Sequence, residues 1–142
     1  MFIGEFHHTL DEKGRLSIPV KFRAALSGGA VVTRGLDRSL FLYTKQEWEA
    51  LAAKIAALPI GQADTRAFAR LMLAGAMDVE VDKSGRVTVP EYLRAYAGLS
   101  KDVVVTGLYD RLEIWDQTAW DVYSSKTEAA GNDIAERLGS VI

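Results

Sequence analysis

The residues of this chain that could do chemistry stand in two short stretches of similar sequence, "DEKGRLSIP" and "DKSGRVTVP", which are identical at four of nine positions. Each stretch places an Asp four residues before an Arg, with a Lys between them: Asp11, Lys13 and Arg15 in the first, and Asp82, Lys83 and Arg86 in the second. An Asp at the start of a tight turn can accept from turn N–H groups and can also hold the Arg guanidinium. A guanidinium fixed in one pose can donate to a phosphate or, in bidentate fashion, to a guanine edge.

Turn formation by itself explains part of this pattern. Asp favours the first position of a turn, and Gly tolerates the positive φ that follows. The Arg could simply pair with the Asp across the turn, and a duplicated fold would duplicate its turns. The turn does not require an Arg, however, and basic side chains recur in both loops. The residues alone leave both explanations open: a structural pair in each turn, or a binding site in which Arg15 and Arg86 contact a phosphate or a base edge and Lys13 and Lys83 add phosphate contacts.

The charge of the chain restricts how such a site could bind. The net charge is −2 and the pI is near 5.7, so only local patches could attract nucleic acid. Residues 11–23 carry two acidic against four basic side chains, and residues 78–94 carry four acidic against three basic. We expect the first copy to be the more basic surface. One subunit should bind DNA weakly, because affinity grows with the number of phosphates neutralised.

Other classes of site find little support in the composition. The chain has no cysteine, which excludes disulfides and Cys-ligated metals. His7 and His8 are adjacent in an expected strand and should point to opposite faces, so we predict no metal site. There is no catalytic Ser–His–Asp spacing and no carboxylate cluster, and we predict neither an enzyme nor a bound cofactor. No segment resembles a signal peptide or a membrane span, which predicts a soluble, cytoplasmic protein.

The elements that must position the arginines follow from periodicity. Residues 6–10 and 15–19 alternate apolar and polar side chains around "DEKG", and residues 77–81 and 87–89 do so around "DKSG", which predicts two β-hairpins. A short helix should follow each of Pro19 and Pro90 and should end near Gly28 and Gly98.

A second likeness extends the duplication. The stretch "VVTRGLDRSLFLY" resembles "VVVTGLYDRLEIW", which predicts a second hairpin in each half. A helix should follow each of these hairpins, with Thr44 or Asp116 as its N-cap and with Trp48 and Trp120 at matched positions. The chain then divides into a first repeat at 5–51, a connecting helical segment at 52–75, a second repeat at 76–123 and a C-terminal tail at 124–142. The connecting helix should be capped by Asp64 or Thr65 and should pack antiparallel to the helix before it.

Two copies of D-x-x-G-R-φ-x-φ-P, where φ is apolar, resemble the motifs of the MraZ family, whose bacterial members are encoded with the cell-division and cell-wall genes. Each half resembles the DNA-binding module of AbrB/SpoVT regulators. The resemblance implies an α+β, β-rich fold: a pseudo-twofold, duplicated swapped-hairpin barrel of the AbrB type with packed helices. It also implies a ring-shaped homo-oligomer, nucleoid association and transcriptional regulation of the family's own operon. The resemblance further implies that the D-x-x-x-R motifs bind double-stranded DNA, so we expect Arg15 and Arg86 to contact DNA, with Lys13 and Lys83 beside them and Asp11 and Asp82 completing the motifs.

Ring assembly would compensate for the weak DNA binding of a single subunit, because several linked subunits on one DNA molecule bind at a high effective concentration. We therefore expect a promoter target with repeated short sites. The alternative is an oligomeric, antitoxin-like module in which the paired loops bind a protein partner.

Overall fold

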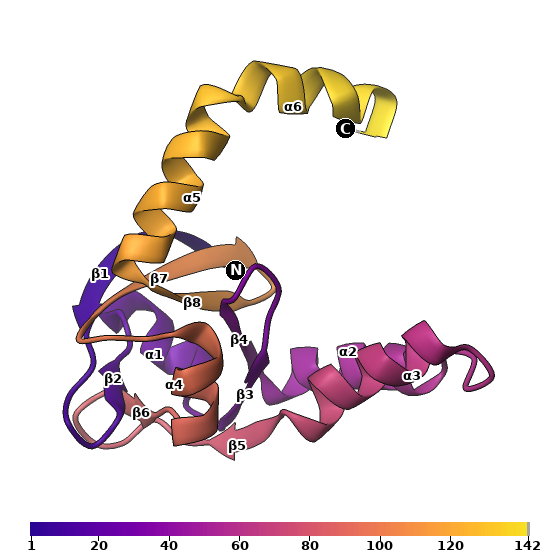
Figure 1. Cartoon of the computed structure of the whole chain (residues 1–142). Helices are drawn as coiled ribbons and strands as arrows, with labels where there is room; N and C mark the ends of the chain where they lie inside the picture. The colour runs from indigo at the N-terminus through magenta and orange to yellow at the C-terminus, as the bar shows by residue number, and fades with distance from the viewer. Residues whose placement is uncertain (142) are drawn as a thin grey trace.

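The computed structural model describes residues 1–141 and has an α+β architecture with a mostly antiparallel sheet (Figure 1). The strands are β1 (Phe2–Thr9), β2 (Arg15–Ser17), β3 (Ala30–Arg34), β4 (Leu40–Thr44), β5 (Met77–Val79), β6 (Arg86–Thr88), β7 (Asp102–Tyr109) and β8 (Leu112–Asp116). The α-helices are α1 (Val20–Leu26), α2 (Lys45–Ala56), α3 (Ala63–Ala69), α4 (Glu91–Ala97), α5 (Gln117–Ala129) and α6 (Gly131–Leu138). A π-helical turn, η1 (Arg70–Ala74), extends α3, and a 3₁₀ turn, η2 (Gly139–Val141), follows α6.

The expectation of a closed barrel is wrong for residues 1–141. Six strands form one sheet in the order β1-β7-β8-β4-β3-β5, whose ends β1 and β5 do not pair with each other. The remaining strands, β2 and β6, form a separate two-stranded sheet. Among residues 1–141, β2 and β6 form a ladder only with each other, so they stay outside the six-stranded sheet and do not close it.

The hairpin predictions are confirmed in part. β3 pairs with β4 and β7 with β8, as alternating patterns around short loops predict. The turns "DEKG" and "DKSG" are also present, but the strands beside them make different pairings. β1 pairs along its length with β7, and β5 pairs with β3. Only an isolated bridge between Leu10 and Leu16 joins the two sides of the first turn as strands.

A single apolar core unites the two halves of the chain. Leu16 and Ile18 from the first half lie beside Val87 and Val89 from the second, and all four side chains are at most 2% exposed. Phe22 of α1 and Leu93 of α4 join the same cluster. Because these residues alternate with, or follow, the functional candidates on the same short segments, burial of the core fixes which way the arginines face.

The helix ends follow local sequence signals. Thr44 caps α2 by accepting from the backbone N–H of Glu47, and Asp116 caps α5 by accepting from that of Ala119, as predicted. Pro19 and Pro90 stand one position before α1 and α4 and not at their first helical residues. Gly98 ends α4 in the left-handed conformation, with a φ of 60°.

α2, which begins within the predicted first repeat, forms an arm together with α3 and η1 of the connecting segment, and the three project together from one side of the sheets (Figure 1). Met72, Ile55, Phe41 and Tyr43 form a second buried cluster at the base of this arm. The expected cap is wrong, because Gln62 precedes α3 without a side-chain cap. The Thr65 hydroxyl instead donates to carbonyl oxygens of the loop, at Pro59 and Gln62.

The C-terminal segment is helical through its described length. α5 continues past Ser124 to Ala129 and extends away from the sheets, and α6 follows at an angle beyond its end (Figure 1). Neither helix has a buried residue. Within residues 1–141, no helix has the length and apolar character needed to cross a membrane.

Candidate nucleic-acid interface

The two D-x-x-x-R motifs meet in the small sheet formed by β2 and β6. The strands are antiparallel, with Leu16 opposite Val87, Arg15 opposite Thr88 and Ser17 opposite Arg86. Leu16 and Val87 face the core and are 0% and 2% exposed. Because successive side chains on a strand point to opposite faces, Arg15, Ser17, Arg86 and Thr88 share the outer face. We call this four-residue outer surface of β2 and β6 the arginine ribbon.

The two turns that precede these strands are built alike. One carboxylate oxygen of Asp11 accepts from the backbone N–H groups of Lys13 and Arg15, at 3.0 and 2.8 Å. One carboxylate oxygen of Asp82 accepts from those of Ser84 and Arg86, both at 2.9 Å. Gly14 and Gly85 close the turns at φ values of 79° and 78°, which a glycine adopts without strain. The chain therefore makes the same Asp-anchored turn twice.

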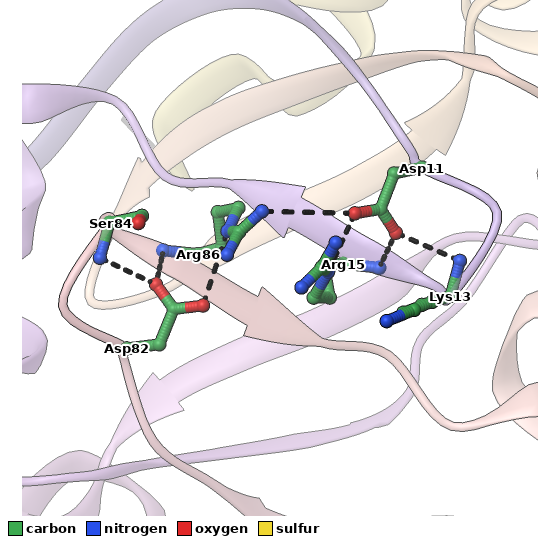
Figure 2. Close-up of polar contacts among 6 residues, drawn as sticks. All are labelled: Asp11, Lys13, Arg15, Asp82, Ser84 and Arg86. Atoms are coloured by element: carbon green, nitrogen blue, oxygen red, sulfur yellow. Dashed lines mark hydrogen bonds and ion pairs between the residues drawn. The ribbon is translucent and has the colours of Figure 1, made fainter.

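The second oxygen of each Asp holds the arginine side chains, as Figure 2 shows. The Nε of Arg15 donates to Asp11 Oδ2 at 2.6 Å, and the Nε of Arg86 donates to Asp82 Oδ2 at 3.1 Å. Asp11 Oδ2 also lies 3.9 Å from Nη1 of Arg86, so this carboxylate joins the two repeats. Arg15 and Arg86 are fixed beside one another and are still about one-third exposed, at 32% and 30%.

The electrostatics of both carboxylates favour the ionised form. The pKa of Asp11 is lowered, first by the hydrogen bond from the Arg15 backbone N–H and then by the Arg15 guanidinium and the Lys13 N–H. The pKa of Asp82 is lowered in the same way by the backbone N–H groups of Arg86 and Ser84 and by the Arg86 guanidinium. Because hydrogen bonding favours the charged acceptor, both Asp side chains stay negative and keep their arginines in place near neutral pH.

The two candidate lysines do not occupy equivalent places. Lys13 and Ser84 share the third turn position, where each backbone N–H binds the Asp, whereas Lys83 corresponds to Glu12. The structure thus brings four of the six candidate residues together at the arginine ribbon, namely Asp11, Arg15, Asp82 and Arg86 (Figure 2). Lys13 and Lys83 are exposed at non-equivalent positions of the two turns.

Sequence reasoning missed two further arginines, Arg23 of α1 and Arg94 of α4. A Cβ placed on Gly85 would overlap the guanidinium of Arg23, and one placed on Gly14 would lie 2.9 Å from Cζ of Arg94. Each helix arginine therefore covers the turn of the other repeat. A signal was present in the sequence, because each of these arginines stands eight residues after the motif arginine of its own half.

The two histidines do not join the arginine ribbon, and they do not form a metal site in residues 1–141. His7 is exposed and contacts Glu5 at 2.9 Å and Gln117 at 3.0 Å, and its pKa is raised mainly by the hydrogen bond to Glu5. Burial lowers the pKa of His8. Among residues 1–141, no group of three His, Asp or Glu side chains could hold a metal ion. A cleft of about 660 Å³ is lined by Trp115 of β8, Tyr123 of α5 and residues of α4 and the β3–β4 loop. None of the six candidate residues lines it.

Comparison with known proteins gives one consistent family. The family model described as "MraZ protein, putative antitoxin-like" matches the chain twice, at residues 1–71 and 72–140. The chain is 49% identical to the "Transcriptional regulator MraZ" of Natranaerobius thermophilus over 138 residues, which cover 97% of this chain and 96% of that protein. Proteins of the same name from Acetivibrio thermocellus and Carboxydothermus hydrogenoformans are 47% and 48% identical over the same shares of the two chains.

Proposed function

The chain belongs to the MraZ family, and from that premise we propose that it is a DNA-binding transcriptional regulator that contacts DNA through the arginine ribbon. Its curated relatives are named as transcriptional regulators, which is not a class of enzyme. We propose as its target the promoter of the cell-division and cell-wall gene cluster that includes its own gene, because family members are encoded there. Its place of action would then be the cytoplasm, on the nucleoid, and it would need no cofactor.

The observation that carries this proposal is the pairing of Arg15 and Arg86 on one two-stranded antiparallel ribbon. The major groove of B-DNA is about 12 Å wide and admits an element of this kind. Arg15 and Arg86 are offset by two residues across facing strands. Standard strand dimensions then separate their Cα atoms by about 8 Å, so both side chains fit in one groove. Each guanidinium is held by an Asp and needs little further ordering to donate to a base edge or a phosphate.

Affinity of the whole protein would come from several such ribbons. The net charge of −2 gives no general attraction to DNA, so one ribbon would bind weakly. We propose a ring of identical subunits that places several ribbons on a promoter with repeated short sites. Apolar side chains exposed outside the ribbon would supply the contacts between subunits. They lie on the arm and on the C-terminal helices: Leu58, Ile60, Phe68, Val122, Tyr123, Leu138 and Val141.

The proposed organisation keeps two AbrB-like repeats, at 5–51 and 76–123, joined by the segment 52–75 and followed by the tail 124–142. Pairing between β2 and β6 supports an interlocked arrangement of the swapped-hairpin type, because each motif strand completes its ladder with the other half. Pairing of β1 with β7 and of β4 with β8 joins the halves again in the large sheet.

The second candidate function is an oligomeric module that binds a protein partner through the same loops. The description of the matching family as antitoxin-like favours it. The two functions differ in their response to salt, because DNA binding that releases counterions weakens steeply as salt rises.

The experiment that tests the proposal measures binding to the DNA upstream of the protein's own gene by gel shift and by fluorescence anisotropy across salt concentrations. Arg15→Ala with Arg86→Ala should abolish specific binding and leave the oligomer intact by light scattering. Arg70→Ala with Arg137→Ala is the matched control, because it removes two exposed arginines away from the ribbon. Binding of the first variant as tight as that of the parent would overturn the proposal. Binding of a protein partner with no DNA binding would favour the second candidate.

A further inference from the structure

Arg23 and Arg94 hold the two turns in a reciprocal arrangement. Arg23 belongs to the first repeat and lies over Gly85 in the turn of the second repeat. Arg94 belongs to the second repeat and lies over Gly14 in the turn of the first. Both glycines are buried in spite of their place in surface turns, since the guanidinium groups cover them. Each helix arginine is therefore part of the surface that the opposite motif presents.

On each side one hydrogen bond holds the arginine, and a second, between backbone groups, joins its acceptor residue to the turn of the other repeat. The Nε of Arg23 donates to the carbonyl of Ile18 at 2.8 Å, and the backbone N–H of Ile18 donates to the carbonyl of Gly85 at 2.9 Å. On the other side, the Nε of Arg94 donates to the carbonyl of Val89 at 3.0 Å, and the N–H of Val89 donates to the carbonyl of Gly14 at 2.8 Å. The terminal nitrogens of both guanidinium groups have no hydrogen-bond partner among residues 1–141, so they are available to a ligand.

Each arginine borders a cleft with a second cation. Arg23 lines a cleft of about 340 Å³ together with Lys83 and Asp82. Arg94 lines a cleft of about 470 Å³ together with Lys101, Asp11 and Glu12. Asp82 and Asp11 are already engaged by Arg86 and Arg15. The first cleft thus has two cations and no further carboxylate, whereas Glu12 adds an unengaged carboxylate to the second.

The positions of the clefts fit the two sides of a DNA groove. Gly14 and Gly85 lie at opposite ends of the β2–β6 pair, offset by four residues across the strands. Strand geometry separates their Cα atoms by about 14 Å. This span slightly exceeds the major-groove width of about 12 Å. When Arg15 and Arg86 enter the groove, Arg94 and Arg23 therefore stand at the phosphates along its two edges.

We infer that the clefts at Arg23 and Arg94 are two phosphate-binding sites that flank the arginine ribbon and bind the DNA backbone on both edges of the major groove. This inference rests on the proposed function. Arg15 and Arg86 contact base edges in the groove. Arg23 and Arg94 contact phosphates, which fixes the position of the protein on the DNA and contributes to the salt dependence of binding without recognising sequence. The cleft at Arg23 is the stronger site, because no unengaged carboxylate opposes its two cations. In the charge count over residues 11–23, Arg23 is added to the first motif. In the structure its charge lies at the turn of the second motif.

The test compares Arg23→Gln, Arg94→Gln and Lys101→Gln with the parent on a specific duplex and on an unrelated duplex. Each lost phosphate contact should lower the magnitude of the salt slope by about 0.9, which corresponds to about fivefold weaker binding at 0.15 M salt. Both duplexes should weaken equally, so the ratio of specific to unrelated binding stays constant. Arg23→Gln should cost more than Arg94→Gln. Arg70→Gln, which removes an exposed charge from η1, should leave the slope unchanged.

The outcomes separate the two proposals. Slopes that stay at the parent value in all three variants overturn the phosphate sites and leave the role of Arg15 and Arg86 standing. A changed ratio of specific to unrelated binding also overturns the phosphate assignment, because backbone contacts carry no sequence information directly. Lys101→Gln decides the matter if the arginine variants fail to fold, since the Lys101 side chain makes no hydrogen bond in the described part of the chain. A parent protein that binds no DNA overturns both proposals.

Discussion

Replacing Gly85 with Ala tests whether the turns and the helix arginines form one unit. The φ of 78° at this position costs a residue with a Cβ about 1–2 kcal/mol. The new methyl group would also overlap the Arg23 guanidinium, which must move away because it is the free end of a flexible side chain. We therefore expect Gly85→Ala to lower the free energy of unfolding by about 1–2 kcal/mol. For a chain of 142 residues this lowers Tm by roughly 3–7 °C.

The displaced arginine should also weaken DNA binding. Loss of one phosphate contact predicts about fivefold lower affinity at 0.15 M salt, with a salt slope smaller by about 0.9. Gly14→Ala should behave in the same direction with a smaller displacement, because its Cβ would lie 2.9 Å from Cζ of Arg94. Gly28→Ala is the matched control, since φ is not positive there and no heavy atom lies within 4 Å of the added Cβ.

Urea denaturation and anisotropy titrations on the same preparations measure both effects. Gly28→Ala should change the free energy of unfolding by no more than about 0.5 kcal/mol. The reasoning fails if Gly85→Ala is as stable as Gly28→Ala and binds DNA with the slope of the parent. Loss of stability with an unchanged slope would refute only the part that concerns Arg23.

Three further predictions concern the elements that support the ribbon. Leu16→Ala should cost about 2–5 kcal/mol in urea denaturation, because this fully buried side chain sits between the two repeats; a cost below 1 kcal/mol would refute the shared core. Thr44→Ala should cost about 1 kcal/mol by removing the cap of α2, with no change in DNA affinity, and a change in affinity would contradict the separation of arm and ribbon. Asp11 and Asp82 have lowered pKa values in the fold, so their contribution to stability is complete above the unfolded value of about 3.8 and is lost as pH falls through the lowered folded value. Denaturation between pH 5 and pH 2.5 should show a weaker acid dependence for Asp11→Asn with Asp82→Asn, and an unchanged dependence would contradict the role of these carboxylates.

Local sequence signals predicted much of the fold. Alternation around short loops identified the β3–β4 and β7–β8 hairpins, and Thr44 and Asp116 marked the starts of α2 and α5, because these features depend on neighbouring residues alone. The pairing of β2 with β6 could not be predicted from the same local signals. Leu16 and Val87 are 71 positions apart, and their alternation fits a partner strand in either half equally well. The closed barrel was implied by the family resemblance, and it was wrong for residues 1–141 because β2 and β6 form a separate sheet and the larger sheet stays open between β1 and β5.

The candidate site was predicted in its residue types and incompletely in its geometry. Asp11 with Arg15 and Asp82 with Arg86 stood out because the spacing matches an Asp-anchored turn. Arg23 and Arg94 did not stand out, because each acts on the turn of the opposite repeat. Both stand eight residues after the motif arginine of their own half, which the sequence shows. Their contact with the opposite turn depends on how the two halves interlock, which the spacing does not reveal. The asymmetry of Lys13 and Lys83 could have been seen by aligning the two loops position by position.

The most direct test of the central claim asks which surface of the protein touches DNA. The chain has no natural cysteine, so one introduced cysteine gives a unique attachment point for a photo-crosslinker. Ser17→Cys places the probe on the outer face of the arginine ribbon, opposite Arg86, and Ser125→Cys places it on the exposed surface of α5. On promoter DNA the account predicts crosslinks from position 17 and none from position 125. Crosslinks from position 125 with none from position 17 would contradict it.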